Sequence, residues 1–355
     1  MSKYWSKTVK DIKPYVPGEQ PKDRKYIKLN TNENPYPPSP KVIEAIRKAA
    51  GAALRLYPDP SSDELRDTIA AAFSLKRENV FVGNGSDELL AFCFPAFFET
   101  AGKPILFADI TYSFYPVYAE FFSMPYQLIE VDGSFNVPVE GYFQKNGGII
   151  IANPNAPTGK GIPLVDIEKV LKKNESSVVI LDEAYVDFGG DSAVSLISRY
   201  PNLLVIRTLS KSYSLAGLRV GFALGGEELI EGIIRVKDSI NSYTVDRLAQ
   251  AGARQAIQDD AYFQETRRKI MKTRERVTLK LEAQGFRVIP SQANFIFVSH
   301  VQCPGRDLFQ KLREKGILVR YFDKPKIDNF IRVTIGTDGE MNQFLETVAV
   351  ICGPE

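Results

Sequence analysis

The chain has 355 residues, of which 44% are hydrophobic and 25% are charged, a balance typical of a globular protein with a sizeable core. Its formal net charge of +2 is too small to indicate a nucleic-acid-binding or anionic-membrane-binding surface. No stretch approaches the roughly 20 uninterrupted apolar residues of a membrane span, and the opening MSKYWSKTVKDIKPY lacks the apolar core of a secretory signal.

The cysteine and histidine counts exclude several kinds of site. Cys93, Cys303 and Cys352 are scattered and have no metal-ligand spacing, so we expect a cytoplasmic protein without disulfides or a bound metal. His300 is the single histidine, which excludes zinc sites built from two or three imidazoles of one chain. No nucleophile-elbow sequence accompanies it, so a Ser-His-Asp triad is not indicated. Acid–base chemistry would fall to lysine, tyrosine or carboxylate side chains.

The first part of the chain predicts an arm followed by helices. The Pro-rich NENPYPPSP (32–40) is typical of an extended connection, so we expect residues 1–40 to form an N-terminal arm that packs with a small domain. A helix is predicted over 61–73, where Ser61 and Glu64 have the spacing of a capping box.

Residues 80–225 alternate short apolar runs with amphipathic segments. The runs span 80–83, 104–109, 148–154, 177–185, 202–210 and 220–225, and helices are predicted over 86–99 and 163–173. Several runs are continuously apolar, as expected of strands buried on both faces of a mostly parallel sheet. The sequence therefore predicts an α/β fold with a large domain at 41–245.

The remaining residues, 246–355, predict a smaller α+β domain. Charged helical segments at 227–241 and 256–284 precede strands at 287–300, 317–322 and 330–337, with helices at 305–316 and 341–353. The dense charge of 259–284 is most simply the solvated face of a long helix.

Two strand ends carry candidates for anion and amide contacts. After the run VFV, Gly83 and Gly85 permit a tight turn, and Ser86 and Asp87 open a helix whose free N–H groups would suit a phosphate. After GIII comes NPNAPTG, a rigid turn that carries the amide of Asn155. Because ligands of open α/β sheets bind beyond the carboxyl ends of the strands, both turns border the expected site.

Asp182 and Tyr185 follow the buried run VVIL. A carboxylate at the end of a buried strand is costly unless it meets a cation, and a protonated ring nitrogen would serve. Asp182 and Glu183 are adjacent and should point to opposite faces, so they do not form a glycosidase-type pair.

Lys211 follows the next run, LLVIRTLS, with Ser210 before it and Arg219 shortly after. A partly desolvated lysine amine is a nucleophile towards an aldehyde, and an arginine can bind a phosphate in bidentate fashion. A phosphate site, an amide, an acid for a ring nitrogen and an amine for an aldehyde together match pyridoxal phosphate.

These residues fall in an ordered set of motifs: LNTNENPYPPSP, RLYPDP, GNGSDELL, TYSFY, NPNAPTG, LDEAYVDF, RTLSKSYSLAGLRVGF, GILVRY and FIRVTIGT. Over essentially its whole length the sequence resembles the fold-type I aminotransferases, and within them the histidinol-phosphate aminotransferase family. The resemblance implies a large domain with a mostly parallel, helix-flanked sheet, a smaller α+β domain and pyridoxal 5'-phosphate as cofactor.

The resemblance also implies the residues that contact the cofactor ring. Lys211 would attach the cofactor covalently and later move a proton between Cα of the substrate and C4′ of the cofactor, while Asp182 would bind the pyridine nitrogen. Tyr185 and Asn155 would hydrogen-bond the phenolic oxygen, and Tyr112 would stack on the ring.

By the same resemblance, Ser86, Asp87 through its backbone N–H, Ser210 and Arg219 would hold the cofactor phosphate. Tyr57 would reach the phosphate of the neighbouring subunit's cofactor, which implies a homodimer.

The resemblance assigns the substrate to two arginines. Arg332 would bind the carboxylate of glutamate and 2-oxoglutarate and, with Arg320, the phosphate of histidinol phosphate; Asn32 would border the substrate. One departure is visible, since the usual NPNNPTG reads NPNAPTG with Ala156 in the second amide position.

The implied reaction is a ping-pong transfer of an amino group between glutamate and imidazole-acetol phosphate in histidine biosynthesis. Three alternatives remain open from the sequence: an aromatic amino-acid aminotransferase, a threonine-phosphate decarboxylase on the same scaffold, and a cofactor-binding sensory domain of a transcription regulator. The nearly balanced charge and the lack of a basic helix-turn-helix segment count against the last.

Overall fold

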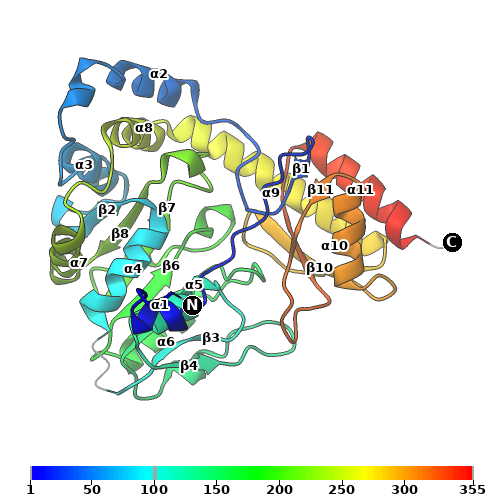
Figure 1. The fold of residues 1–355 in the computed structure, drawn as a ribbon, viewed down its shortest axis with the longest axis horizontal. Helices are drawn as coiled ribbons and strands as arrows, with labels where there is room; N and C mark the ends of the chain where they lie inside the picture. The colour runs from blue at the N-terminus through cyan, green and yellow to red at the C-terminus, as the bar shows by residue number, and fades with distance from the viewer. Residues whose placement is uncertain (1, 99–101, 354–355) are drawn as a thin grey trace.

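The computed structural model describes residues 2–98 and 102–353, and its main feature is a seven-stranded sheet (Figure 1). The strand order is β2-β8-β7-β6-β5-β3-β4. Strands β7, β6, β5, β3 and β4 pair in parallel, and β8 is antiparallel to both of its neighbours. The strands are β2 (Val80–Gly83), β3 (Ile105–Ala108), β4 (Tyr126–Ile129), β5 (Gly148–Ala152), β6 (Val179–Asp182), β7 (Leu203–Thr208) and β8 (Gly221–Gly225). The expected mostly parallel α/β fold is confirmed.

Continuous apolar runs form the central strands because both faces of this sheet are covered. Every residue of β5, β6 and β7 is buried. Successive residues enter opposite cores: Ile149 and Ile151 pack on one face, and Ile150 packs on the other. The edge strand β4 was not expected, since Gln127 and Leu128 are exposed and interrupt the apolar pattern.

Helices cover both faces of the sheet, with α2, α3 and α8 at the upper left of Figure 1 and α5 and α6 in its lower part. Those before the second sheet are α1 (Lys7–Asp11), α2 (Pro40–Ala49), α3 (Asp63–Ala72), α4 (Gly85–Phe97), α5 (Phe114–Phe121), α6 (Leu164–Lys173), α7 (Glu227–Ile240) and α8 (Arg247–Gln258). Short 3₁₀ turns are η1 (Ala52–Arg55), η2 (Arg77–Asn79), η3 (Val139–Tyr142), η4 (Val186–Phe188), η5 (Ala193–Leu196) and η6 (Ala216–Leu218).

Helix α3 begins differently from the expected capping box. Its N-cap residue is Ser62, in the left-handed region at φ 53°, and no side chain of that residue caps the helix. The carboxylate of Asp59 instead accepts hydrogen bonds from the N–H groups of Ser61, at 2.9 Å, and Asp63, at 2.7 Å. The Asp59 side chain, rather than Ser61, therefore satisfies the free N–H of the first helical residue, Asp63.

A smaller four-stranded antiparallel sheet has the order β12-β13-β10-β9. Its strands are β9 (Phe286–Ile289), β10 (Phe295–His300), β12 (Arg320–Tyr321) and β13 (Ile331–Thr334), and its helices are α9 (Asp260–Ala283), α10 (Gly305–Glu314) and α11 (Asp338–Cys352). The segment 287–300, expected as one strand, forms two strands that pair with each other. Helix α9 runs from beside α8 to this sheet (Figure 1).

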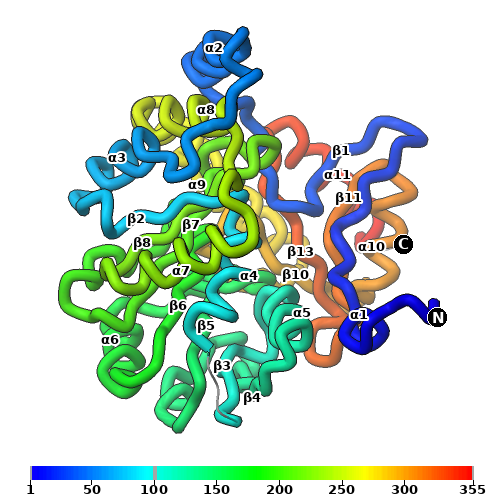
Figure 2. The backbone as a smooth tube through the Cα atoms, turned by 60° about the vertical axis from the view of Figure 1, so that its left-hand side comes forward, coloured from blue at the N-terminus to red at the C-terminus, as the bar shows by residue number. Residues whose placement is uncertain are grey.

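The N-terminal segment packs against the smaller sheet, and α8 packs against the larger one. Strand β1 (Ile27–Lys28) pairs in parallel with β11 (Ile317–Leu318), and Leu29 lies in the same core as β10 and β13. Figure 2 shows the N-terminal segment passing along α10 and β11. Ala249 and Ala253 of α8 share a core with the larger sheet, so that core extends beyond residue 245, where we expected the large unit to end.

No helix within the described ranges is long and apolar enough to cross a bilayer. Across the same two ranges, no group of three or more histidine, cysteine or acidic side chains has the arrangement of a metal site. Cys93, Cys303 and Cys352 are free thiols.

Candidate active site

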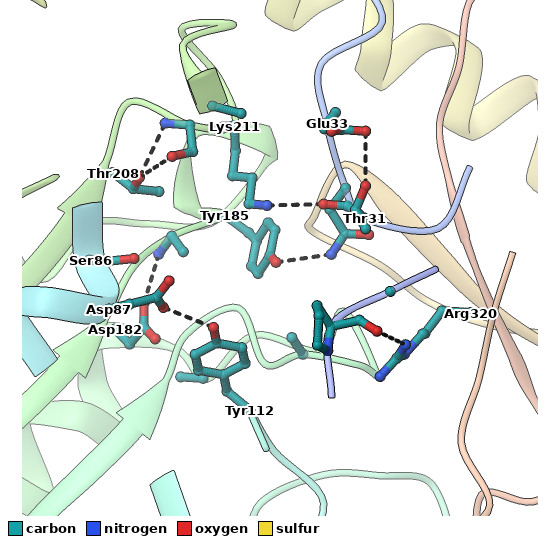
Figure 3. A pocket seen from close by; sticks show the side chains of 18 of the residues that line it. Thr31, Glu33, Ser86, Asp87, Tyr112, Asp182, Tyr185, Thr208, Lys211 and Arg320 are labelled. Carbon is teal, nitrogen blue, oxygen red and sulfur yellow. Dashed lines mark hydrogen bonds between the residues drawn. The ribbon is translucent and has the colours of Figure 1, made fainter. Parts of the chain in front are cut away.

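A cavity opens beyond the carboxyl ends of β5, β6 and β7 and is closed by the N-terminal segment and by β12 and β13 (Figure 3). All the predicted site residues except two line it: Asn32, Ser86, Asp87, Tyr112, Asp182, Tyr185, Ser210, Lys211, Arg219, Arg320 and Arg332. The parallel strands bring these residues together because their carboxyl ends lie at one edge of the sheet.

Lys211 lies in the loop that follows β7, with its side chain directed into the cavity. Its Nζ donates a hydrogen bond to the carbonyl oxygen of Thr31 at 3.1 Å and lies 5.8 Å from the centre of the Tyr185 ring. The amide of Asn34 donates to the Lys211 carbonyl oxygen at 3.1 Å and thereby ties this loop to the N-terminal segment.

Asp182 ends β6, and the residue is only 5% exposed. Its Oδ2 accepts a hydrogen bond from the Tyr115 hydroxyl at 2.8 Å, and its Oδ1 accepts one from the N–H of Ala184 at 3.2 Å. Burial raises the pKa of Asp182 to about 6, against the opposing effects of these hydrogen bonds and of the Lys211 charge. A cation placed beside this carboxylate would favour its ionised form.

Several hydrogen-bond donors that could bind an anion lie at the other end of the cavity, where α4 begins. Ser86 lies in the first turn of α4, and the Nη1 of Arg219 reaches the Oγ of Ser210 at 3.4 Å. Arg219 has a left-handed backbone at φ 53°, an uncommon conformation for a residue with a β-carbon. A helix N-terminus, two hydroxyls and a guanidinium form a donor set that suits a phosphate.

Gly221 permits the close approach of β8 to the start of α4. A β-carbon at position 221 would lie 2.6 Å from the carbonyl carbon of Gly85 and 2.6 Å from the nitrogen of Ser86. Both contacts are with backbone, so no side-chain movement could relieve them. The end of the cavity at the start of α4 therefore depends on a residue without a side chain.

Two tyrosines of the cavity are fixed by hydrogen bonds. The Tyr112 hydroxyl donates to the Oδ1 of Asp87 at 2.8 Å, and burial raises the pKa of Tyr112 well above its ordinary value. The Tyr185 hydroxyl accepts from the Nδ2 of Asn32 at 2.9 Å, so its own proton is free to be donated into the cavity. Asn32 itself is buried and has a left-handed backbone at φ 57°.

Arg320 and Arg332 lie opposite each other on the antiparallel strands β12 and β13. The Nη2 of Arg332 donates to the carbonyl oxygen of Asn30 at 2.9 Å, whereas its buried Nε has no partner within the described residues. Burial and the charge of Arg320 lower the pKa of Arg332. Arg332 lines the cavity, and a guanidinium that retains an unpaired donor is suited to an anionic ligand.

The guanidinium of Arg320 is hydrogen-bonded to the backbone of the N-terminal segment. It donates to the carbonyl oxygens of Val16, at 3.0 Å, and Pro17, at 3.3 Å. Neutral carbonyl oxygens leave the charge of the guanidinium uncompensated, so an entering phosphate could take their place.

Asn155 and Tyr57 do not line the cavity. The Nδ2 of Asn155 donates to the carbonyl oxygen of Ile110 at 2.9 Å, and its Oδ1 accepts from the Thr111 hydroxyl at 2.8 Å. Its neighbour Ala156, which has no side-chain amide, lines the cavity instead. Tyr57 is 77% exposed and stacks on Tyr243, with ring centres 4.4 Å apart.

The sequence did not identify two contributors. Tyr15, from the N-terminal segment, lines the cavity and stacks on Phe114 with ring centres 4.3 Å apart. Tyr115 does not line the cavity, but its hydroxyl donates a hydrogen bond to Asp182. Nothing in the local sequence marks either residue as part of the site.

The geometry agrees with the similarity of the chain to known proteins. Residues 24–348 match the family described as "Aminotransferase class I and II". A histidinol-phosphate aminotransferase of Clostridium acetobutylicum is 59% identical over 98% of this chain and 99% of its own length. One of Clostridium beijerinckii is 57% identical over 99% of this chain and 98% of its own.

Among solved structures, histidinol-phosphate aminotransferase from Sinorhizobium meliloti, in complex with pyridoxal-5'-phosphate, has the same fold. Its TM-score is 0.90 at 24% identity, over 99% of this chain and 98% of that one. The family match and the full-length relatives confirm the expectation drawn from the motifs: the chain belongs to the class I and II aminotransferases.

Proposed function

We propose that this enzyme transfers an amino group between glutamate and imidazole-acetol phosphate, giving 2-oxoglutarate and histidinol phosphate, with pyridoxal phosphate as cofactor. The observation that carries the proposal is that Lys211 and Asp182 line one cavity. That cavity has hydrogen-bond donors suited to a phosphate at one end and two arginines at the other. The full-length relatives named histidinol-phosphate aminotransferase support the choice of substrate.

The residues present fit this cofactor. When bound, pyridoxal phosphate supplies an aldehyde for the amine and a ring that accepts electrons from the substrate. Ser86, Ser210 and Arg219, with the N–H groups at the start of α4, would hold its phosphate. Asp182 would keep the ring nitrogen protonated, and Tyr112 would cover the ring.

Lys211 would first hold the cofactor and then move the proton. Its Nζ lies near the Tyr185 ring and donates to the Thr31 carbonyl, so the amine that would move the proton lies inside the cavity. The Tyr185 hydroxyl, positioned by Asn32, would donate to the phenolic oxygen of the cofactor. We do not assign this contact to Asn155, because the Asn155 amide is bound to Ile110 and Thr158.

The two half-reactions use one cavity for two different anions. Arg332 would bind the carboxylate of glutamate through its unpaired Nε, and Arg320 would join it on the phosphate of histidinol phosphate after leaving the carbonyls of Val16 and Pro17. Planar guanidinium groups bind both carboxylates and phosphates in bidentate fashion, so one pair can serve both substrates.

We further propose that the enzyme acts as a homodimer in which Tyr57 completes the partner's phosphate site. The exposed apolar side chains near Tyr57 support this arrangement: Leu54 and Leu56 are 55% and 52% exposed, and Tyr243 is 42% exposed. Large apolar side chains gathered on one surface favour burial against another chain.

Steady-state kinetics test the substrate assignment. With 2-oxoglutarate as acceptor, kcat/KM for histidinol phosphate should exceed kcat/KM for phenylalanine and for tyrosine, because only histidinol phosphate carries a phosphate for the two arginines. Arg320→Lys should reduce kcat/KM for histidinol phosphate more than for glutamate. A higher value for phenylalanine would show an aromatic amino-acid aminotransferase, and release of CO₂ from O-phosphothreonine without amino transfer would show a decarboxylase.

A further inference from the structure

The hydroxyl of Tyr115 is buried and, among the residues that the structure describes, has one hydrogen-bond partner, the carboxylate of Asp182. Tyr115 lies in the first turn of α5, is 0% exposed, and packs edge-on against Phe107 with ring centres 5.9 Å apart. Its hydroxyl donates to the Oδ2 of Asp182 at 2.8 Å. A buried phenol placed against a buried acid constrains that acid strongly, because neither group can turn to water.

We propose that Tyr115 is the positioning residue of Asp182: its hydrogen bond directs the carboxylate into the cavity and keeps it ionised opposite the ring nitrogen of the cofactor. The proposal rests on the function proposed above, since it takes Asp182 to be the partner of that nitrogen. Tyr115 does not line the cavity and so acts through Asp182.

The two hydrogen bonds to Asp182 fix the plane of its carboxylate. Oδ2 accepts from Tyr115 at 2.8 Å, and Oδ1 accepts from the N–H of Ala184 at 3.2 Å. Each carboxylate oxygen can accept two hydrogen bonds, so both retain acceptor capacity for a donor in the cavity. Without the Tyr115 hydroxyl, one oxygen would have no protein donor, and rotation about the side chain would cost less.

The charges around Asp182 explain why this donor matters. Burial and, to a smaller extent, the carboxylate of Asp87 on α4 raise the pKa of Asp182, whereas Lys211 lowers it, and the net result is a pKa of about 6. Two other tyrosines in or next to α5, Tyr112 and Tyr118, donate hydrogen bonds to Asp87. Both stay protonated, because burial raises the pKa of each.

Tyr115 remains a hydrogen-bond donor at neutral pH and well above it. Burial and the neighbouring Asp182 raise the pKa of Tyr115 well above its ordinary value. Its hydrogen bond therefore opposes the effect of burial on Asp182 without itself titrating.

The chain offers a matched control in Tyr142. Its hydroxyl is also buried, at 0% exposure of the residue, and has no hydrogen-bond partner within the described residues. Tyr115→Phe and Tyr142→Phe each remove one buried hydroxyl and keep the ring in its core. Only the first removes a donor from Asp182, so a general effect of a lost hydroxyl would appear in both variants.

The direct test follows the protonation of Asp182 in the full-length, cofactor-free protein by NMR of ¹³C-labelled aspartate carboxyls. Asp182→Asn identifies the resonance, because that signal disappears. The titration midpoint should move to higher pH by about one unit in Tyr115→Phe and stay at the wild-type value in Tyr142→Phe. A Tyr115→Phe midpoint equal to that of the wild type would overturn the proposal.

A second measurement uses the loaded enzyme. In Tyr115→Phe, kcat should fall at least tenfold near neutral pH with little change in KM, and the acid side of its pH profile should move upwards. A shifted midpoint with an unchanged kcat profile would also overturn the proposed role. The NMR titration needs no turnover, so it remains decisive for Tyr115 and Asp182 even if the proposed transamination fails.

Discussion

Asp182 and Glu183 are adjacent in sequence, but their carboxyl groups lie in different surroundings. Asp182 faces the cavity, whereas Glu183 is buried on the opposite side and accepts hydrogen bonds from Ser192 Oγ at 2.6 Å and the N–H of Ala193 at 2.7 Å. The sequence-based expectation that they point to opposite faces is met, because successive strand side chains alternate. Burial raises the pKa of Glu183 to about 7, although the charge of Arg207 opposes it.

These raised pKa values predict how the stability of the cofactor-free protein depends on pH. Glu183 has an ordinary pKa of 4.5 and a folded value of about 7, so between these values the folded state holds a proton that the unfolded chain has released. The free energy of unfolding should therefore fall as pH rises from 5 to 7, by up to about 1.4 kcal/mol per pH unit for this group.

Denaturant titrations of the wild type and of Glu183→Gln at several pH values check this dependence. The glutamine cannot titrate, so its curve should fall less steeply over the same range. Parallel curves for the two proteins would show that Glu183 stays ionised in the folded state.

The site residues that could be predicted from sequence are those fixed by backbone position. Asp182 and Lys211 follow buried strands, and the edge of a parallel sheet brings such positions together whatever their side chains do. Asn155 shows the limit, since its amide turns to the carbonyl of Ile110 and leaves Ala156 on the cavity wall. A local sequence pattern does not determine which of two neighbouring residues faces inward.

The start of α4 and strand β8 would together form the proposed anion-binding element. Gly221 of β8 pairs with Gly83 of β2, and the helix starts immediately after that strand. The close approach of backbone to backbone lets the N–H groups at the start of α4 face the cavity rather than a side chain.

Gly221→Ala should therefore destabilise the protein by about 1–3 kcal/mol, because the added carbon meets the Gly85–Ser86 peptide. It should also weaken pyridoxal phosphate binding, which equilibrium dialysis would measure. Gly339→Ala in α11 is the control, since a β-carbon there would meet no atom within 4 Å. Equal stability of the two variants would contradict this view of β8.

Elements with strong apolar runs could be predicted, and elements with weak ones could not. Strands β5 to β7 are wholly buried and read as continuous apolar stretches. Helix α8, RLAQAGARQAIQ, is amphipathic but buries mainly alanines and a glycine, whose small side chains do not form an apolar run like those of the strands. The start of α3 was misassigned because Asp59, outside the expected helix, supplies the capping carboxylate.

In the whole molecule, the cavity forms where three distant parts of the chain meet. The N-terminal segment supplies Tyr15 and Asn32, the large sheet supplies Lys211, and the smaller sheet supplies Arg320 and Arg332. The family resemblance placed the arginines and Asn32 at the substrate end, but contacts such as Arg320 with Val16 depend on tertiary packing that no local pattern encodes.

Complementation between two defective variants tests the proposed homodimer. Lys211→Ala and Tyr57→Ala should each be impaired alone, yet a mixed dimer would pair the intact Lys211 of one chain with the intact Tyr57 of the other. Random mixing would make half of the dimers mixed, with one complete site each, so activity should recover to about a quarter of wild type.

Sedimentation should give a mass twice the 39.7 kDa of the chain. No recovery of activity in a mixture shown to contain mixed dimers would mean that Tyr57 does not serve the partner's site.

The most direct test of the account is the visible absorbance spectrum of the purified protein with pyridoxal phosphate, recorded before and after addition of histidinol phosphate. The wild type should be yellow and should lose that colour on the addition, as the amino group passes to the cofactor, while Lys211→Ala should lack the original band. A wild-type spectrum that histidinol phosphate leaves unchanged, or a Lys211→Ala protein that reacts as the wild type does, would contradict the central claim.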